Sequence, residues 1–278
     1  MSTKSNTSSP YENIQKNQAE GRRLEDQYGF YKKHIRKNTI IFDEAVTMSD
    51  DAVVLDVGTG RGSWLLDLAR TAPPSISLYG VDICTTFFPS HGSNIAFSEH
   101  SCTALPQGWT NKFDFVNQNL LAASLTRGDW ITDIQEIFRV TKPGGHIQLY
   151  EPSCANWDCP PDSANGKMKA LFKALFDSNS LMSDIGERLS PMLTDAGFVD
   201  VRAHNGTYPV NANDGRQGKE GARLTLLWLR CLQPSMLRLG ILNSDREYEL
   251  LIEEIQKEWD EGVPYQNHFL FYATKPVA

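Results

Sequence analysis

Short apolar runs alternate with longer amphipathic segments over residues 53–152, and this alternation carries most of the information about the fold. Residues 53–57 (VVLDV) have the nearly continuous hydrophobicity of a strand that is buried on both faces. Residues 63–70 (SWLLDLAR) follow with the spacing of a helix. Repetition of strand and helix is typical of a doubly wound sheet. We therefore predict an α/β fold built around a mostly parallel sheet.

The segments that flank this region predict helical additions to the sheet. Residues 1–10 are rich in Ser, Thr and Asn and are expected to be disordered, whereas broken apolar stripes over residues 20–48 predict one or two helices. Pro191 and Pro234 lie in helical patterns that we expect them to kink or break. The expected division is a tail and helical cap at 1–48, a core at 49–204, a helical insertion at 205–267, and a final strand and tail at 268–278. We interpret the insertion as a lid or a homodimer surface.

A glycine-rich turn follows the first predicted strand and decides the class of ligand. Glycine lets the backbone approach a ligand closely, because no Cβ stands in the way. The dinucleotide fingerprint requires a glycine at position 63, where this chain has Ser63. Asp56 precedes the turn, and it would repel a pyrophosphate but attract an ammonium group. A nucleoside with an amino-acid tail fits both features, so we predict S-adenosylmethionine as the cofactor. The turn contributes Gly58, Thr59 and Gly60 as cofactor-binding residues.

A second acid at a strand end supports this prediction. Residues 77–83 (SLYGVDI) form another short apolar run that ends near Asp82. A carboxylate at the tip of the next strand can accept hydrogen bonds from both hydroxyls of a ribose. Ile83 beside it offers an apolar face for the adenine ring. An ordinary tight turn would explain the glycines alone. It would not explain why an acid also lies at the end of each of two successive strands.

These motifs resemble those of the class I S-adenosylmethionine-dependent methyltransferases. The similarity extends from residue 53 to residue 152 through the segments LDVGTGRG, VDI, NIAFSEHSCTALP, KFDFVNQNLL and RVTKPGGHIQLYEP. It implies a Rossmann-like sheet of seven strands, with Asn117 and Glu151 beside the cofactor crevice. Ser101 and Cys102 replace the acid that the family commonly has before its Leu-Pro pair, so a hydroxyl or backbone amides are expected to bind the adenine. Trp130, the Pro-Gly-Gly segment and the C-terminal NHFLFYATKP also resemble the LaeA-like fungal methyltransferases, which implies tailoring of natural products.

Composition and charge narrow the range of partners. The chain has 278 residues and a net charge of −7, which argues against a nucleic acid or an anionic membrane as partner. The first residues lack the apolar core of a secretory signal, and no segment approaches the roughly 20 apolar residues of a membrane helix. The five cysteines show neither a disulfide pattern nor a metal-binding pattern. We expect a cytoplasmic protein that binds no metal.

Candidate residues for catalysis and for acceptor binding come from the ends of the predicted elements. Methyl transfer from a sulfonium is a direct displacement, so the protein contributes mainly alignment and the exclusion of water. A base is needed only when the acceptor must lose a proton, and Glu151 and His34 are the candidates. An aromatic or heterocyclic small molecule, methylated at oxygen or nitrogen, would stack on aromatic side chains. The candidate substrate-binding residues are Tyr28, Tyr31, Trp157 and Tyr208.

Two other functions are compatible with the same motifs. A regulatory or interaction protein could keep the cofactor fold without turnover. A pericyclase or lyase could use the cofactor only as a positive charge. Detection of a methylated product separates both from a methyltransferase.

Overall fold

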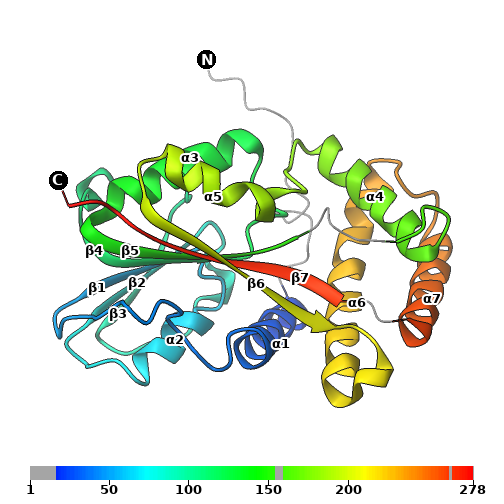
Figure 1. Ribbon diagram of the computed structural model, residues 1–278, viewed down its shortest axis with the longest axis horizontal. Coiled ribbons are helices and arrows are strands. Elements are labelled where there is room, and N and C mark those ends of the chain that lie inside the picture. The colour runs from blue at the N-terminus through cyan, green and yellow to red at the C-terminus, as the bar shows by residue number, and fades with distance from the viewer. Residues whose placement is uncertain (1–16, 154–158, 263–264, 278) are drawn as a thin grey trace.

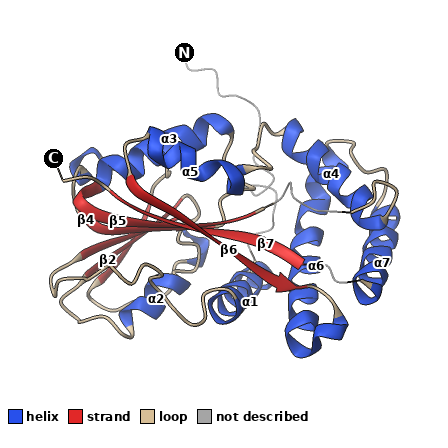
Figure 2. Cartoon of the chain, in the orientation of Figure 1, coloured by secondary structure: helices blue, strands red, loops and turns tan. Residues whose placement is uncertain are grey.

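A seven-stranded sheet forms the centre of the molecule, with helices on both faces (Figures 1 and 2). The computed structural model describes residues 17–153, 159–262 and 265–277. The strand order is β3-β2-β1-β4-β5-β7-β6, and β7 runs antiparallel to both of its neighbours. The predicted α/β fold with a mostly parallel sheet is confirmed. The strands are β1 (Val53–Val57), β2 (Ser77–Asp82), β3 (Ile95–Glu99), β4 (Phe113–Asn119), β5 (Thr141–Pro152), β6 (Val199–Pro209) and β7 (Tyr265–Thr274).

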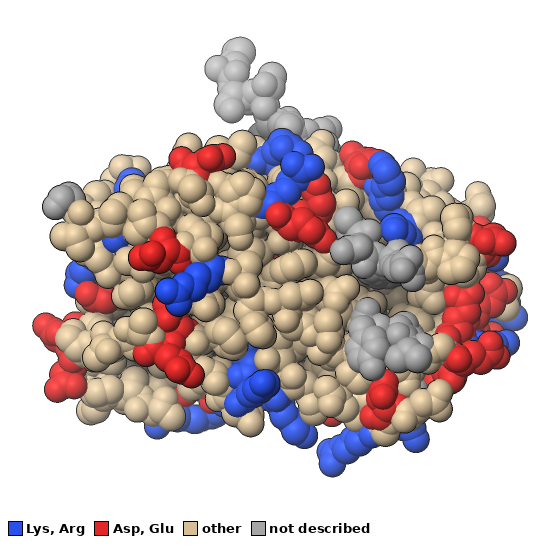
Figure 3. Space-filling model, viewed as in Figure 1, with Lys and Arg blue, Asp and Glu red and all other residues tan. Residues whose placement is uncertain are grey.

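The helices cover the two faces of the sheet and build a separate lobe at one end. Helices α3 and α5 lie on one face, α1 and α2 lie on the other, and α4, α6 and α7 form the lobe (Figure 1). Acidic side chains gather over α7 on the face that Figure 3 shows. The helices are α1 (Gln18–His34), α2 (Ser63–Ala69), α3 (Arg127–Val140), α4 (Ala164–Ser178), α5 (Ile185–Asp195), α6 (Gly215–Arg238) and α7 (Asp245–Glu261).

Local sequence signals explain where several helices begin. Thr126 and Asp129 form a reciprocal capping box at the start of α3. The Ser244 hydroxyl accepts from the backbone N–H of Glu247 and caps α7. Because such caps depend on residues three apart in sequence, the starts of these helices are determined locally.

The helical lobe includes one helix that the sequence assigned to the core. Glu258 of α7 accepts hydrogen bonds from the backbone N–H groups of Ala164 and Asn165 at the start of α4, at 2.6 and 3.0 Å. The indole of Trp259 donates to the Asn165 side chain at 2.9 Å. Helix α4 therefore packs with the insertion, although it precedes β6 in the chain.

Two prolines lie inside helices that continue past them. Pro234 lies inside α6, so the break expected there is wrong, and Pro191 lies inside α5, where a kink or a break was expected and no break occurs. A proline removes one hydrogen bond and costs about 3 kcal/mol in a helix interior. Both helices bury a long apolar face, which for α6 includes Leu229 and Leu232, and this burial outweighs the lost hydrogen bond.

Strand register brings residues that are distant in sequence onto one face of the sheet. Asn119 is opposite Tyr150, and Tyr150 is opposite Leu270 on β7. Opposite residues share a face, and so do residues two apart on a strand. His268 and Tyr208 therefore lie on the same face as Tyr150, since His268 is opposite Gly206. This face packs against α1.

Candidate functional site

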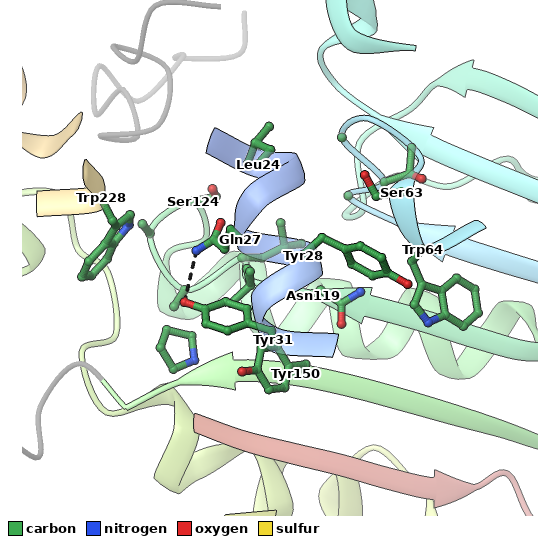
Figure 4. A pocket seen from close by; sticks show the side chains of 18 of the residues that line it. Leu24, Gln27, Tyr28, Tyr31, Ser63, Trp64, Asn119, Ser124, Tyr150 and Trp228 are labelled. Atoms are coloured by element: carbon green, nitrogen blue, oxygen red, sulfur yellow. Dashed lines mark hydrogen bonds between the residues drawn. The ribbon is translucent and has the colours of Figure 1, made fainter. Parts of the chain in front are cut away.

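A cleft opens at the carboxyl ends of β1, β2, β4 and β5, beneath α1 and beside α6 (Figure 4). In an open α/β sheet this edge is the usual place for a ligand. One group of lining residues surrounds the glycine turn, and a second group is aromatic. The first group includes Asp56, Gly58, Thr59, Gly60, Asp82, Ile83, Ser101 and Cys102. The second includes Tyr31, Tyr150, Tyr208, Trp228 and His268.

The three glycines of the turn have different structural roles, although all have positive φ. A Cβ on Gly58 would lie 2.9 Å from Leu121, and one on Gly62 would lie 2.5 Å from Phe97. A Cβ on Gly60 would have its nearest neighbour, Leu24, at 4.0 Å. Gly58 and Gly62 are therefore required by packing, whereas Gly60 leaves space for a ligand at the backbone. This cradle fits the predicted cofactor.

Asp56 is almost completely buried and held in place by two neutral donors. The Thr59 hydroxyl and the Asn117 amide donate to its two oxygens, each at 2.6 Å. Burial raises the pKa of Asp56 from 3.8 to about 6, against the lowering effect of these hydrogen bonds and of the Arg36 charge. Asn117 is 0% exposed and does not line the cleft. Asn117, predicted to bind the cofactor, instead contacts Asp56 in this structure.

Asp82 connects the glycine turn to the segment after β2. Its carboxylate accepts from the backbone N–H groups of Gly60 and Cys84, both at 2.9 Å. A carboxylate has about four acceptor sites, so these two bonds leave capacity for ribose hydroxyls. Ile83 is 57% exposed and lines the cleft, as expected for a surface that covers a ring.

Ser101 and Cys102 line the cleft where the adenine is expected. The Ser101 hydroxyl lies 2.8 Å from that of Thr103. Burial raises the pKa of the Cys102 thiol, as do the charge and the hydrogen bond of buried Asp133. The Cys102 side chain is therefore a neutral thiol, and it offers the cofactor no charge in place of the missing acid.

Neither expected base faces the cleft. Glu151 is 0% exposed, and its oxygens accept from the backbone N–H groups of Leu121 and Ala122 at 2.8 and 2.9 Å. His34 packs its ring against Phe30 at 4.6 Å and does not line the cleft. The prediction of Glu151 and His34 as bases gains no support from this geometry, because neither side chain lines the cleft. Glu151 instead fixes the loop that follows β4.

The predicted substrate-binding aromatic residues occupy different positions in the structure. Tyr31 and Tyr208 line the aromatic end of the cleft, with ring centroids 5.7 Å apart. Tyr28 also lines the cleft, but its hydroxyl donates to Asp67 of α2 at 2.7 Å, so it anchors α1. Trp157 lies outside the described residues.

Several lining residues carry no signal in the sequence that would mark them as part of the cleft. Arg36 is buried, donates to Asn119, and lies with its guanidinium carbon 4.7 Å from the centre of the Tyr150 ring. Tyr150 and His268 stack at 5.2 Å with nearly parallel rings. The alternation in HFLFY places His268 on one face of β7 together with Leu270. Only the register with β5 shows that this face meets the cleft.

The fold and the cleft resemble those of the class I S-adenosylmethionine-dependent methyltransferases, and comparisons with known proteins agree. The methyltransferase-domain family matches residues 54–145. N-methyltransferase tcpN of Claviceps purpurea is 26% identical over 94% of this chain and 95% of its own length. N-methyltransferase sirN of Leptosphaeria maculans is 32% identical over 48% of this chain and 46% of its own.

A solved structure shows the same fold. Phosphoethanolamine N-methyltransferase 2 of Haemonchus contortus in complex with S-adenosyl-L-methionine superposes with a TM-score of 0.59 and 15% identity, over 98% of this chain and 61% of that one. This chain therefore shares the fold of that enzyme, and its residues 54–145 match the methyltransferase domain. The narrower resemblance to the LaeA-like group stays a prediction. Over the described residues, no helix is long and apolar enough to cross a membrane.

Proposed function

We propose that this chain methylates a nitrogen atom of a small, flat natural-product acceptor by direct displacement. The observation that carries this proposal is the continuity of the cleft from the glycine turn to the aromatic residues. Such a cleft can hold a cofactor at one end and an acceptor at the other. Several relatives are named N-methyltransferases, which supports nitrogen as the methylated atom.

The charged residues of the cleft suit the two ends of an amino-acid tail. The Asp56 carboxylate would hold the ammonium group, and the buried Arg36 guanidinium would hold the carboxylate. Arg36 lies close enough to Asp56 to lower its pKa, and its buried Nε has no hydrogen-bond partner among the described residues. A buried donor without a partner is unfavourable, so a ligand carboxylate at this position would relieve the cost. Asp82 would hold the ribose, and Ile83 would cover the adenine.

The chemistry needs alignment more than acid or base groups. When bound, the cofactor supplies an activated methyl group, whose carbon–sulfur bond breaks as the bond to the acceptor forms, and sulfur keeps the electron pair. The walls of the cleft hold the acceptor in line with that bond and exclude water.

The protonation states of the aromatic end support nitrogen over oxygen. Burial and, to a smaller extent, the charge of Arg36 lower the pKa of His268 to about 3, so His268 is a neutral and weak base. Burial also raises the pKa of Tyr150 and Tyr208 well above 10. An uncharged amine nitrogen attacks with its own lone pair, whereas a hydroxyl group reacts well only after it loses a proton.

Methyl-labelled S-adenosylmethionine and a small-molecule extract of the host organism test the proposal. We expect a low-molecular-weight product that gains one methyl group on nitrogen, and we expect Asp82→Asn to slow its formation. Cofactor binding without a methylated product would favour a regulatory protein. A rearranged product of unchanged mass would favour a pericyclase.

We also propose a cytoplasmic location, because the Cys84 and Cys102 side chains are free thiols. Microscopy of a tagged full-length chain tests it. The role of α6 and α7 as a lid or a homodimer surface also stays a prediction, and sedimentation of the purified chain tests the dimer.

A further inference from the structure

Two buried polar atoms at the aromatic end of the cleft have no hydrogen-bond partner in the described part of the chain. They are the Tyr150 hydroxyl oxygen and His268 Nδ1, on side chains that are 1% and 4% exposed. Buried polar groups are nearly always hydrogen-bonded, so each exception calls for an explanation. Both residues line the cleft. A ligand in the cleft is the explanation that the geometry offers.

The surrounding side chains form a compartment with flat walls. Tyr31 and Tyr208 lie beside the stacked pair, with ring centroids 4.7 and 5.3 Å from that of His268. Figure 4 shows Tyr31 of α1 and Tyr150 of β5 close to one another, with Trp228 on the opposite side of the opening. Stacked and edge-on aromatic rings present both broad faces and polar rims to a ligand. The compartment therefore favours a flat molecule with polar atoms at its edge.

The compartment also lacks a negative charge that could hold a cation. Among the described lining residues only Asp56 and Asp82 have carboxylates, and both belong to the glycine-turn end of the cleft. Nearby Glu151 is engaged with backbone N–H groups, and Glu187 accepts from the Ser153 hydroxyl at 2.6 Å. A cationic acceptor would therefore meet no compensating acid in this compartment.

We propose that this compartment binds the methyl acceptor in its uncharged form, through hydrogen bonds to the Tyr150 hydroxyl and His268 Nδ1. The inference rests on the proposed function and specifies the acceptor class, a flat neutral molecule with polar atoms at its edge. Tyr150 can donate, and Nδ1 accepts or donates according to the tautomer of the ring. The compartment excludes a protonated amine, so only the unprotonated form of the acceptor binds and is methylated.

Benzamide and benzamidinium are matched probes for this proposal, because they share size and flatness and differ in charge at neutral pH. Each is titrated calorimetrically into the full chain saturated with S-adenosylhomocysteine. We expect benzamide to bind at least roughly tenfold more tightly than benzamidinium, since an uncompensated buried charge costs more than a hydrogen bond gains. Equal binding of the two probes, tighter binding of benzamidinium, or no binding of either would overturn the proposal.

Conservative variants test the two named residues. Tyr150→Phe and His268→Phe keep the rings and remove the polar atoms, and each is expected to weaken benzamide binding by roughly two- to tenfold. Tyr272→Phe removes a hydroxyl on the same strand as His268 but outside the cleft, and it should leave the affinity unchanged. Unchanged benzamide affinity in both cleft variants would overturn the assignment.

The affinity for S-adenosylhomocysteine separates this inference from the proposed function. All three variants should keep that affinity, which shows that the cofactor end is intact. Wild-type methyl transfer without probe discrimination would refute the neutral compartment alone. Failure of wild type to bind S-adenosylhomocysteine would refute the proposed function itself.

Discussion

Replacement of Glu151 by Gln tests the structural role assigned to this buried carboxyl group. Its two oxygens accept from the backbone N–H groups of Leu121 and Ala122, in the loop that packs over Gly58. A Gln amide has one acceptor oxygen, so one of these buried N–H groups loses its partner at a cost of about 1–3 kcal/mol. The same change removes the ionisable group. The variant therefore separates the hydrogen bonds of Glu151 from its titration.

The titration of Glu151 predicts a specific dependence of stability on pH. Burial raises the pKa of Glu151 from 4.5 to about 8, and the backbone hydrogen bonds oppose this only in part. The folded state then keeps a proton that the unfolded state loses, so stability is highest below the unfolded pKa and falls as pH rises towards 8. Between about pH 5 and about pH 8 the loss in the free energy of unfolding amounts to roughly 3 kcal/mol. Glu151→Gln should lack this loss.

Glu258 provides a matched control, because its carboxylate also accepts from two backbone N–H groups. Burial raises the pKa of Glu258, but the hydrogen bonds from Asn165 and Ala164 outweigh it and leave the pKa below its usual value. Stability from such a group is present above the unfolded pKa and is lost only as pH falls through the folded pKa. Glu258→Gln should therefore differ from wild type by a constant amount between about pH 5 and about pH 8.

Urea denaturation of the three proteins at several pH values gives the required free energies of unfolding. The difference between wild type and Glu151→Gln should shrink or change sign as pH rises, whereas the difference for Glu258→Gln stays level. A constant difference for Glu151→Gln over this range would show that the folded carboxyl group is ionised throughout. In that case the two N–H donors, rather than burial, dominate the pKa of Glu151.

Three further predictions concern the glycine turn and its acids. S-adenosylhomocysteine should bind wild type more tightly as pH rises through about 6, because ionised Asp56 holds the ammonium group, and calorimetry of Asp56→Asn should show a flatter profile. Gly60→Ala should weaken cofactor binding in the same assay. Gly62→Ala should instead lower the free energy of unfolding in urea by about 1–3 kcal/mol, since the new Cβ would lie 2.5 Å from Phe97. Asp82→Ala should weaken cofactor binding more than Asp82→Asn, because Asn keeps an acceptor for the backbone of the turn.

The glycine-turn end of the site could be predicted from sequence because its signals are local. Asp56 and Gly58 belong to one strand and one turn, and Asp82 ends the next strand. Parallel neighbouring strands end at the same edge of a sheet, so the proximity of these residues follows from the fold class alone. The helix caps at Thr126 and Ser244 are local in the same sense.

The aromatic end could not be predicted, because long-range register determines it. His268 reaches the cleft only because it is opposite Gly206 on one neighbouring strand and Pro152 on the other. A shift of one residue would place it on the far face of the sheet. The orientation of the Glu151 side chain was also not predictable from local signals. Its position at the end of β5 is correct, but its side chain points to the backbone of a neighbouring loop.

Helix α1 connects the two ends of the cleft, which explains why neither end is complete without it. The Tyr28 hydroxyl and the Lys32 ammonium group both bind Asp67 of α2, at 2.7 and 2.5 Å, and these contacts fix α1 over the sheet. Tyr31 of α1 then forms part of the aromatic compartment, and Arg36 follows directly after the helix, close to Asp56. In the proposed function, a single docked element would set the distance between the cofactor tail and the acceptor. Because displacement requires the two reactants in line, the docking of α1 would control that alignment.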